Sequence, residues 1–494
     1  IEKLTNAVSS TLGASGKCVI LEDAQGNPMI TKDGVTVADS ITLLNPVENI
    51  GARLIKEAAR KTVKEAGDGT TTATILAHSI LKEAYAKLNK KNGRIIKEGI
   101  LSAVDKVIDY LNNTSVPVDE KIKEIATIST NNDSELGSLI ADAFMAVGKT
   151  GVVIMEPSSL GETKIEIVEG VEYDKGLLNQ NFITNKENST CELEKPLVLI
   201  VDSKIDSIRQ IQGVLEHVIK ANKALLIIGQ VEAPVLSALV MNKIKGNIKI
   251  NVIDPPAFGL RRKEILEDLS LLTSAQIINE DLGDDLNTIQ IDYLGECLKA
   301  TTNNDQTIIQ VSEINNEVEK IISNIKEKLT TKLKPHQVIG YEQRLARLSA
   351  KVAIVKVGAN SDIELKEKQD RVEDAICATK AAIKEGIVAG GGIALLNAAT
   401  SINEENIGEE ILLKSILYPF KVILENAGIV PNVPQKEGYG INVVTGNMVH
   451  MISEGIIDPL LVTKSALTNA ASVATTILST DCVINNIRVD ESSR

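Results

Sequence analysis

The chain has 494 residues, which is the length of about three ordinary domains. Apolar residues make up 43% and charged residues 24%, so substantial cores are expected, while the net charge of −13 argues against nucleic-acid binding, which needs a basic surface. No run of about 18 apolar residues occurs, so no membrane span is predicted.

The first part of the chain, residues 1–112, is predicted to be mostly helical. Apolar residues recur at helical spacing in 4–13 and 47–67. Between these segments, residues 18–37 contain two short β-rich runs on either side of a Gly-Asn-Pro sequence, which indicates a hairpin.

The middle of the chain has a different pattern. Residues 114–120 (TSVPVDE) look like a hinge, and strands are expected in 151–159 and 163–170. Three apolar runs then follow, separated by helical patterns at about 207–221 and 233–245, and this alternation predicts a buried β-α-β-α-β sheet. The runs are 196–203, 224–230 and 248–254.

From residue 360 onward the helical patterns return, at 364–386, 391–402 and 465–480. The two ends of the chain therefore resemble each other in type, whereas the middle does not. We predict an α+β multidomain fold in which both termini build one helical domain and the α/β middle is inserted into it.

The stretch GDGTTTAT (67–74) lies between two predicted helices, the first ending near Glu65 and the second beginning near Thr70. The free N–H groups at a helix start, together with the threonine hydroxyls, suit phosphate oxygens, and Asp68 suits Mg²⁺. The ordinary alternative is a glycine C-cap followed by a threonine N-cap. Three consecutive threonines favour the phosphate site, because one cap needs only one.

Several other motifs each have a functional and a purely structural interpretation. Lys32 and Asp33 in TKDGVTV suit a phosphate and a metal, or form a plain turn. The glycines of AGGG (389–392) allow close approach to a ligand, or make a tight turn between helices. Asp374 lies in a predicted helix, where a carboxylate most often belongs to a solvated face. Asp458 in GIIDP is placed either to contact a ribose or to cap the following helix.

The cysteines and histidines indicate neither zinc nor a catalytic triad. The five cysteines lie far apart without a Cys-x-x-Cys spacing, and the four histidines are scattered. Reduced thiols and the lack of a recognisable signal peptide suggest a reducing compartment.

The order of the motifs is more specific than any one of them. In chain order the motifs are TKDGVTVA, GDGTTTAT, PPAFGLRRKEILEDL (255–269), RVEDA, AGGGIALL, GIIDP and VTKSALTNAASVA (462–474). This order resembles that of the group I chaperonins, the GroEL type, and the resemblance extends from residue 1 to about residue 487. The segments GDGTTT and AGGG, with Phe258-Gly259 and Arg261-Arg262, carry most of this resemblance.

The resemblance implies a three-domain organisation in five segments. The equatorial domain would comprise 1–112 and 385–494. The intermediate domain would comprise 113–168 and 353–384, and the apical α/β domain 169–352.

The resemblance also implies an ATP site with Mg²⁺, and K⁺ as a further candidate ion. Asp374 and Asp33 would be the catalytic residues, with Asp374 positioning the attacking water, and Asp68 would hold Mg²⁺. The remaining positions that match nucleotide-binding residues are Thr11, Leu12, Gly13, Lys32, Gly69, Thr70, Thr71, Thr72, Gly391, Ile456 and Asp458.

In this family the apical domain binds non-native chains in an apolar groove. The matching positions are Leu177, Phe182, Leu215, Leu236, Val240 and Met241. Helical stripes such as Leu215 or Leu236 with Val240 most often face a core, but the resemblance implies that Leu215, Leu236, Val240 and Met241 are exposed. Asn181 and Gln212 replace apolar groups of the family, and Leu177 replaces an aromatic residue, so one end of the groove is more polar.

These expectations define an ATP-hydrolysing folding chaperonin that forms seven-membered homo-oligomeric rings, single or double. Its partners would be non-native polypeptides and a lid co-chaperonin, and its location a bacterial or virus-infected bacterial cytoplasm, or an organelle matrix. The alternatives are a passive ring that holds unfolded chains without productive hydrolysis, and a small-molecule phosphotransferase that uses the threonine loop.

Overall fold

The computed structural model describes most of the chain. It leaves out residues 23–25, 27, 89–92, 119–120, 131, 149–150, 159–160, 174, 187–188, 256–259, 312–315, 330–340, 342–343, 346–347, 349–350, 360, 435 and 485–494. The Phe258-Gly259 part of the predicted motif and the last two residues of the predicted hinge lie outside the described residues.

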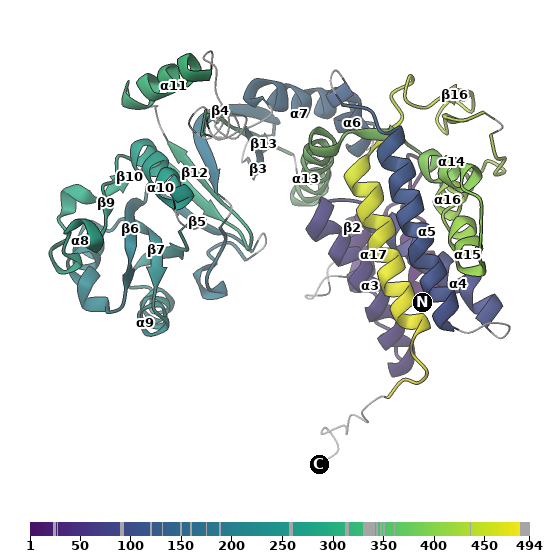
Figure 1. The fold of residues 1–494 in the computed structure, drawn as a ribbon, viewed down its shortest axis with the longest axis horizontal. Helices are drawn as coiled ribbons and strands as arrows, with labels where there is room; N and C mark the ends of the chain where they lie inside the picture. The colour runs from purple at the N-terminus through teal and green to yellow at the C-terminus, as the bar shows by residue number, and fades with distance from the viewer. Residues whose placement is uncertain are drawn as a thin grey trace. The chain divides into compact units, whose positions relative to one another are not determined.

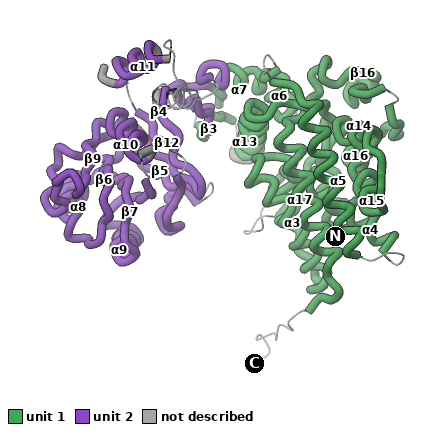
Figure 2. Tube along the Cα trace, in the orientation of Figure 1, with its two compact units in different colours: residues 1–142, 155–164, 356–494 green, residues 143–154, 165–355 purple. Residues whose placement is uncertain are grey.

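The chain folds into two compact units (Figure 2). The first is built from residues 1–142, 155–164 and 356–494, and the second from residues 143–154 and 165–355. Both ends of the chain thus belong to one unit and the middle forms the other. The finer division into equatorial, intermediate and apical segments stays a prediction.

The first unit is mainly helical (Figure 1). Its helices are α1 (Glu2–Ser9), α2 (Gly34–Ser40), α3 (Pro46–Ala66), α4 (Thr70–Leu88), α5 (Gly93–Thr114), α6 (Ile122–Ser129), α13 (Asp362–Glu385), α14 (Ile393–Ser401), α15 (Ile407–Ser415), α16 (Tyr418–Asn426) and α17 (Leu460–Leu478). The C-terminal helix α17 packs against α3, α4 and α5, and α15 packs against α4 and α5. Their shared core is aliphatic and includes Ile55, Leu76, Ile100 and Leu467.

Local sequence signals fix where these helices begin and end. Asn45 caps α3 by accepting hydrogen bonds from the N–H groups of Val47 and Glu48, and Pro46 occupies the first turn, where no N–H is needed. The helix ends at Gly67, whose φ of 74° is in the left-handed region that glycine tolerates. The next helix starts three residues later, as the sequence predicted.

In the described part of the first unit there are also three small antiparallel strand pairs. They are β1 (Val19–Glu22) with β2 (Pro28–Thr31), β14 (Ile387–Ala389) with β17 (Ile457–Pro459), and β15 (Tyr439–Ile441) with β16 (Met448–His450). The β14–β17 pair places Val388 opposite Asp458. This pairing brings the glycine-rich segment after β14 next to the GIIDP motif.

Among the described residues, the second unit contains one whole sheet and most of a second. One is five-stranded, in the order β10-β6-β7-β8 with β9 also on β6, and its β6, β7 and β8 run parallel. Its strands are β6 (Leu197–Ile205), β7 (Ala224–Val231), β8 (Lys249–Ile253), β9 (Ile277–Ile278) and β10 (Gly295–Glu296). Its parallel strands are buried almost throughout, which explains their unbroken apolar sequences.

The other sheet has six strands in the order β3-β13-β4-β12-β11-β5. Its strands are β3 (Val152–Pro157), β4 (Lys164–Tyr173), β5 (Cys191–Glu194), β11 (Lys299–Thr302), β12 (Thr307–Val311) and β13 (Lys351–Val357). The remaining helices are α7 (Ser134–Val147), which crosses the boundary between the units, α8 (Gln212–Ala221), α9 (Ala233–Ile244), α10 (Leu260–Thr273) and α11 (Asn316–Leu329). Short 3-10 helices are Gln180–Phe182, Ile208–Ile211, Glu280–Leu282, Leu286–Thr288 and Ile291–Tyr293.

The predicted α+β multidomain fold is confirmed: the helical ends, the first hairpin and the alternating middle are all present. Residues 34–40, which a plain turn would have left irregular, form the helix α2. Among the described residues, none of the helices combines the length and apolar character needed to span a bilayer.

Candidate functional site

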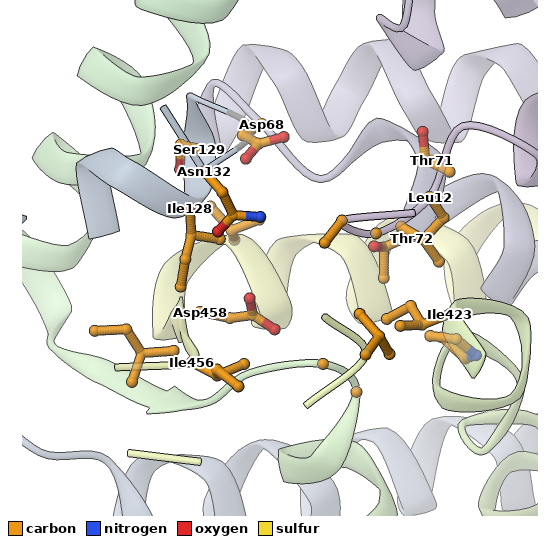
Figure 3. Close-up of a pocket in the computed structure, with 18 of the residues that line it drawn as sticks. Leu12, Asp68, Thr71, Thr72, Ile128, Ser129, Asn132, Ile423, Ile456 and Asp458 are labelled. Carbon is orange, nitrogen blue, oxygen red and sulfur yellow. The ribbon is translucent and has the colours of Figure 1, made fainter. Parts of the chain in front are cut away.

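The first unit contains a cavity of about 810 Å³, within the range of small-molecule sites. All the residues predicted for nucleotide binding and catalysis line it: Thr11, Leu12, Gly13, Lys32, Asp33, Asp68, Gly69, Thr70, Thr71, Thr72, Asp374, Gly391, Ile456 and Asp458. Figure 3 labels six residues of this set around one space: Leu12, Asp68, Thr71, Thr72, Ile456 and Asp458. Their roles in binding stay predictions, but the structure brings them together.

The start of α4 supplies free backbone donors to the cavity, because the first N–H groups of a helix have no partner within it. Gly69 has a φ of 90°, and Thr70 begins the helix. The three threonines differ in their surroundings. Thr70 is only 6% exposed, whereas the hydroxyl of Thr71 lies 3.4 Å from that of Thr11. The segment is thus a helix start with several hydroxyl groups beside it.

Helix α2 approaches the same helix start very closely. A Cβ added to Gly34 would stand 2.3 Å from the Thr71 hydroxyl oxygen and 2.7 Å from that of Thr70. Only a residue without a side chain fits here. This contact places the TKDG segment, with Lys32 and Asp33, directly beside the threonine loop.

Lys32 and Asp33 are both held by local contacts. The Lys32 ammonium donates to the Gly13 carbonyl at 3.1 Å, and burial lowers its pKa. Asp33 caps α2: its carboxylate accepts from the Val35 and Thr36 N–H groups at 3.1 and 2.8 Å and from the Thr36 hydroxyl at 2.6 Å. Asp33 therefore has a structural function as a helix cap in addition to any function towards a metal.

The other three aspartates predicted for the site, Asp68, Asp374 and Asp458, also line the cavity, and each has a raised pKa. Burial raises the pKa of Asp68, with a smaller contribution from the charge of Asp33. Burial, followed by the charges of Asp68 and Asp33, raises the pKa of Asp374 well above its usual range. Burial and the charge of Asp68 raise that of Asp458 to about 7, although the Gly391 N–H hydrogen bond opposes the shift.

This arrangement fits a bound cation. Carboxylates that are buried and repel one another are stable in their charged form only when a positive charge lies between them. Mg²⁺ is commonly held by one or two carboxylates together with phosphate oxygens, and a helix start with free N–H groups provides for the phosphates. The side chains of this cavity therefore match Mg²⁺ with a nucleotide.

The structure adds lining residues that the sequence did not single out. Helix α6 and the residues after it contribute Lys123, Glu124, Thr127, Ile128, Ser129, Asn132 and Ser134. The turn between β15 and β16, with α16, contributes Phe420, Ile423, Ile441, Asn442, Val443, Val444 and Thr445. These segments lack the glycine- and threonine-rich motifs that marked the predicted residues, and tertiary packing brings them to the cavity.

Helix α13 also contributes Glu367, Asp370 and Arg371. Asp370 precedes Asp374 by four residues, and that spacing on a helix could have been used to find it. Burial raises the pKa of Asp370 to about 6, with contributions from Asp33 and Glu373 that Lys366 opposes.

The predicted client-binding residues of the second unit are less exposed than expected. Met241 is 52% exposed, but Val240 is only 7% exposed and packs in the core, so its expected exposure is wrong. Val235, Leu239 and Val240 are the buried residues of α9, and Met241 lies on its other side. Leu177, Leu215 and Leu236 are half-buried against that core, and Phe182 is fully buried in it.

The sequence matches the TCP-1/cpn60 chaperonin family over residues 4–488, and the chain belongs to this family. Its fold is similar to that of the chaperonin gp146 from the bacteriophage EL 2 (Pseudomonas aeruginosa), crystallised in the presence of ATP-BeFx. Crystal form II matches with a TM-score of 0.75 at 22% identity, and form I with a TM-score of 0.66 at 21% identity. Each comparison covers 99% of this chain and 96% of the other.

Proposed function

We propose that this chaperonin is an ATP-dependent molecular chaperone that hydrolyses ATP in the cavity of the first unit. It would assemble into homo-oligomeric rings and capture non-native polypeptides, which it releases into an enclosed space for folding. The observation that carries the proposal is the meeting of Asp68 and Asp374, on separate elements, beside the start of α4 in one cavity.

The proposed role of each residue follows from its position in the cavity. The N–H groups at the start of α4, with the hydroxyls of Thr71 and Thr72, would bind phosphate oxygens, and Asp68 would hold Mg²⁺. When bound, the metal would offset the negative charge of the phosphates. Asp374 would orient a water molecule and accept its proton, and its raised pKa makes it a better proton acceptor than an ordinary aspartate.

The apolar side of the cavity would hold the nucleoside. Ile456 lies on this side, and Asp458 on the neighbouring strand β17 would contact the ribose. The chaperonin gp146, which has a similar fold, was crystallised in the presence of ATP-BeFx, and this supports the proposal of nucleotide binding by this chain. The proposal also includes a lid co-chaperonin, a seven-membered ring and a reducing cytoplasmic location. These three points rest on the family resemblance alone.

The test compares Mg²⁺-dependent ATP hydrolysis by the purified protein with that of Asp374→Ala. The matched control is Glu373→Ala, because Glu373 is the neighbouring acid on α13 and is exposed. We expect hydrolysis by Asp374→Ala to fall at least about a hundredfold, as for loss of a general base. Calorimetry should show that this variant still binds ATP, and Glu373→Ala should hydrolyse ATP normally.

Three results would contradict the proposal. Equal rates for the wild type and Asp374→Ala would remove Asp374 from the reaction. A wild type that binds unfolded protein without hydrolysing ATP would identify a passive holding ring. A particle mass of a single chain, measured by light scattering, would exclude the ring and leave an ordinary phosphotransferase to be considered.

A further inference from the structure

The turn between β16 and β17 joins the β15–β16 pair to one wall of the cavity. It comprises residues 451–455, and its two ends, Met451 and Gly455, line the cavity. Ile456 and Asp458 follow the turn directly and line the cavity as well. The position of the Asp458 carboxylate therefore depends on how this turn is held.

Backbone hydrogen bonds hold the two ends of the turn. The Met451 N–H donates to the Gly438 carbonyl at 2.9 Å, and the Ile456 N–H donates to the Met451 carbonyl at 2.8 Å. The Glu454 N–H donates to the His450 carbonyl at 3.0 Å. The N–H of the residue in the middle of the turn is bound by a side chain instead.

That side chain belongs to His450. Its Nδ1 accepts a hydrogen bond from the Ser453 N–H at 3.3 Å and lies 2.8 Å from the Ser453 hydroxyl oxygen. A ring nitrogen that accepts from an N–H carries no hydrogen itself, so this contact defines the neutral ring with its hydrogen on Nε2. A protonated ring would turn an N–H of its own towards the Ser453 N–H, and this hydrogen bond would be lost.

The ring of His450 is held in this orientation by the strand pair behind it. Tyr439 is opposite His450 in the β15–β16 pair, and the two rings meet edge to face with centroids 5.3 Å apart and planes at 79°. A Cβ added to Gly438 would stand only 3.1 Å from Nε2. These contacts keep Nδ1 directed at the turn.

The charged groups near this contact have other partners or lie in solvent. The Lys436 ammonium lies 4.3 Å from the centre of the Tyr439 ring and donates to the Tyr439 hydroxyl at 3.1 Å. Glu437 accepts from a tyrosine of α5, Lys121 of α6 donates to a carbonyl of the turn, and Glu454 is exposed. The titratable groups on the segments around His450 are Lys121, Glu124, Lys436, Glu437, Tyr439 and Glu454.

We propose that His450 is a positioning residue of the cavity: its neutral ring holds the turn before β17, and protonation of the ring loosens this turn and weakens nucleotide binding. Imidazole is the side chain that ordinarily changes charge between pH 5 and 8. The His450–Ser453 contact is therefore complete at the upper end of this range and is lost as the pH falls. This inference rests on the proposed nucleotide function and adds to it a regulation by pH.

The first test measures hydrogen exchange in the turn without nucleotide, at pH 5.5 and pH 7.5, corrected for intrinsic exchange rates. Protection of the Ser453 amide should fall at least about threefold at the lower pH, since one hydrogen bond of ordinary strength changes an equilibrium by about that factor. His450→Asn keeps an acceptor oxygen that does not titrate in this range, and its protection should stay constant within about twofold. His450→Leu should show low protection at both pH values.

Equal protection of the wild type at the two pH values would overturn the inference. Protection in His450→Leu that matches the wild type at pH 7.5 would do the same, because it would show that the ring does not hold the turn.

The second test measures ADP binding with Mg²⁺ by calorimetry at the same two pH values. Acids of the cavity also titrate in this range, so the informative quantity is the affinity of His450→Asn relative to the wild type. This ratio should be about one at pH 7.5 and at least about three at pH 5.5. The matched control is His217→Asn on α8 in the second unit, which should bind ADP like the wild type at both pH values.

The two tests separate this inference from the function on which it rests. A ratio of one at both pH values, with the expected change in exchange, would show that the turn does not act on the cavity and would overturn the positioning role. A wild type that binds no ADP at either pH would contradict the proposed nucleotide function itself, whatever the exchange of the turn.

Discussion

Gly67 and Cys377 are in direct contact: a Cβ built on Gly67 would stand 2.4 Å from the Cβ of Cys377 and 2.8 Å from its sulfur. Gly67 ends α3, and Cys377 lies on α13, three residues after Asp374. The contact therefore fixes how closely the helix that carries the proposed catalytic acid approaches the loop that carries Asp68.

Gly67→Ala should lower the free energy of unfolding by about 2–4 kcal/mol. Part of this loss comes from its φ of 74°, which is unfavourable for alanine by about 1–2 kcal/mol, and the rest from the clash with α13. ATP hydrolysis should also fall at least about tenfold, because Asp374 is displaced. Urea unfolding and steady-state hydrolysis measure the two effects.

Gly428→Ala is the matched control for this prediction. Gly428 also follows a helix and has a φ of 71°, but nothing lies within 4 Å of its added Cβ. It should therefore show only the backbone effect of about 1–2 kcal/mol, with normal hydrolysis. Equal losses of stability and activity in the two variants would show that the contact with Cys377 does not position α13.

Asp458→Asn should stabilise the nucleotide-free protein at pH 8. The folded-state pKa of about 7 lies above the ordinary value of 3.8, so the folded protein binds this proton more tightly than the unfolded chain does. The resulting stability is present below about pH 4 and is lost as the pH rises through 7. Asparagine avoids the buried charge and keeps an acceptor for the Gly391 N–H.

We expect a gain on the order of 1–3 kcal/mol at pH 8, since one pKa unit corresponds to about 1.4 kcal/mol. The gain should disappear near pH 4, and thermal unfolding across this pH range measures it. The control is Asp109→Asn on the exposed side of α5, which should change little at either pH. A gain that is the same at pH 4 and pH 8 would contradict the buried charge as its cause.

Asp33 combines a cap with a predicted catalytic position, and two substitutions separate these functions. Asp33→Ala removes the acceptor for the Val35 and Thr36 N–H groups and should lower stability by about 1 kcal/mol. Asp33→Asn keeps an acceptor for the cap and removes the charge. Both variants should lose ATP hydrolysis. Only the alanine variant should show a clear loss of stability in urea unfolding. An asparagine variant that still hydrolyses ATP would exclude a catalytic carboxylate at this position.

The neighbours Val240 and Met241 should behave differently when changed. Val240→Ala removes buried methyl groups and should lower the free energy of unfolding by about 1–3 kcal/mol. Met241→Gln should change stability by less than about 0.5 kcal/mol while weakening the capture of an unfolded test protein. Capture that depends on Val240 without any loss of stability would show that this residue becomes exposed in the working protein.

The sequence alone predicted the helical ends of the chain, the first hairpin, the alternating strands and helices of the middle, and the boundary between α3 and α4. Periodic apolar residues, the Asn45 cap and the left-handed Gly67 are local features, and local interactions are enough to place them. It also indicated the residues of the nucleotide site, because the order of the motifs resembles one family. The exposure of Val240 that the same resemblance implied is wrong, because an apolar residue on a helix can pack into the core as well as face a binding groove.

Only the tertiary structure decided which of these residues share a cavity and what else surrounds them. Asp374 fits a solvated helix face by its spacing, yet α13 packs against Gly67 and holds it beside Asp68. Asp458 reaches Gly391 because β14 pairs with β17. Asn442 and Asp370 line the same space without any motif to mark them. Distances between residues far apart in the chain follow from how buried faces fit together, and no local pattern encodes that fit.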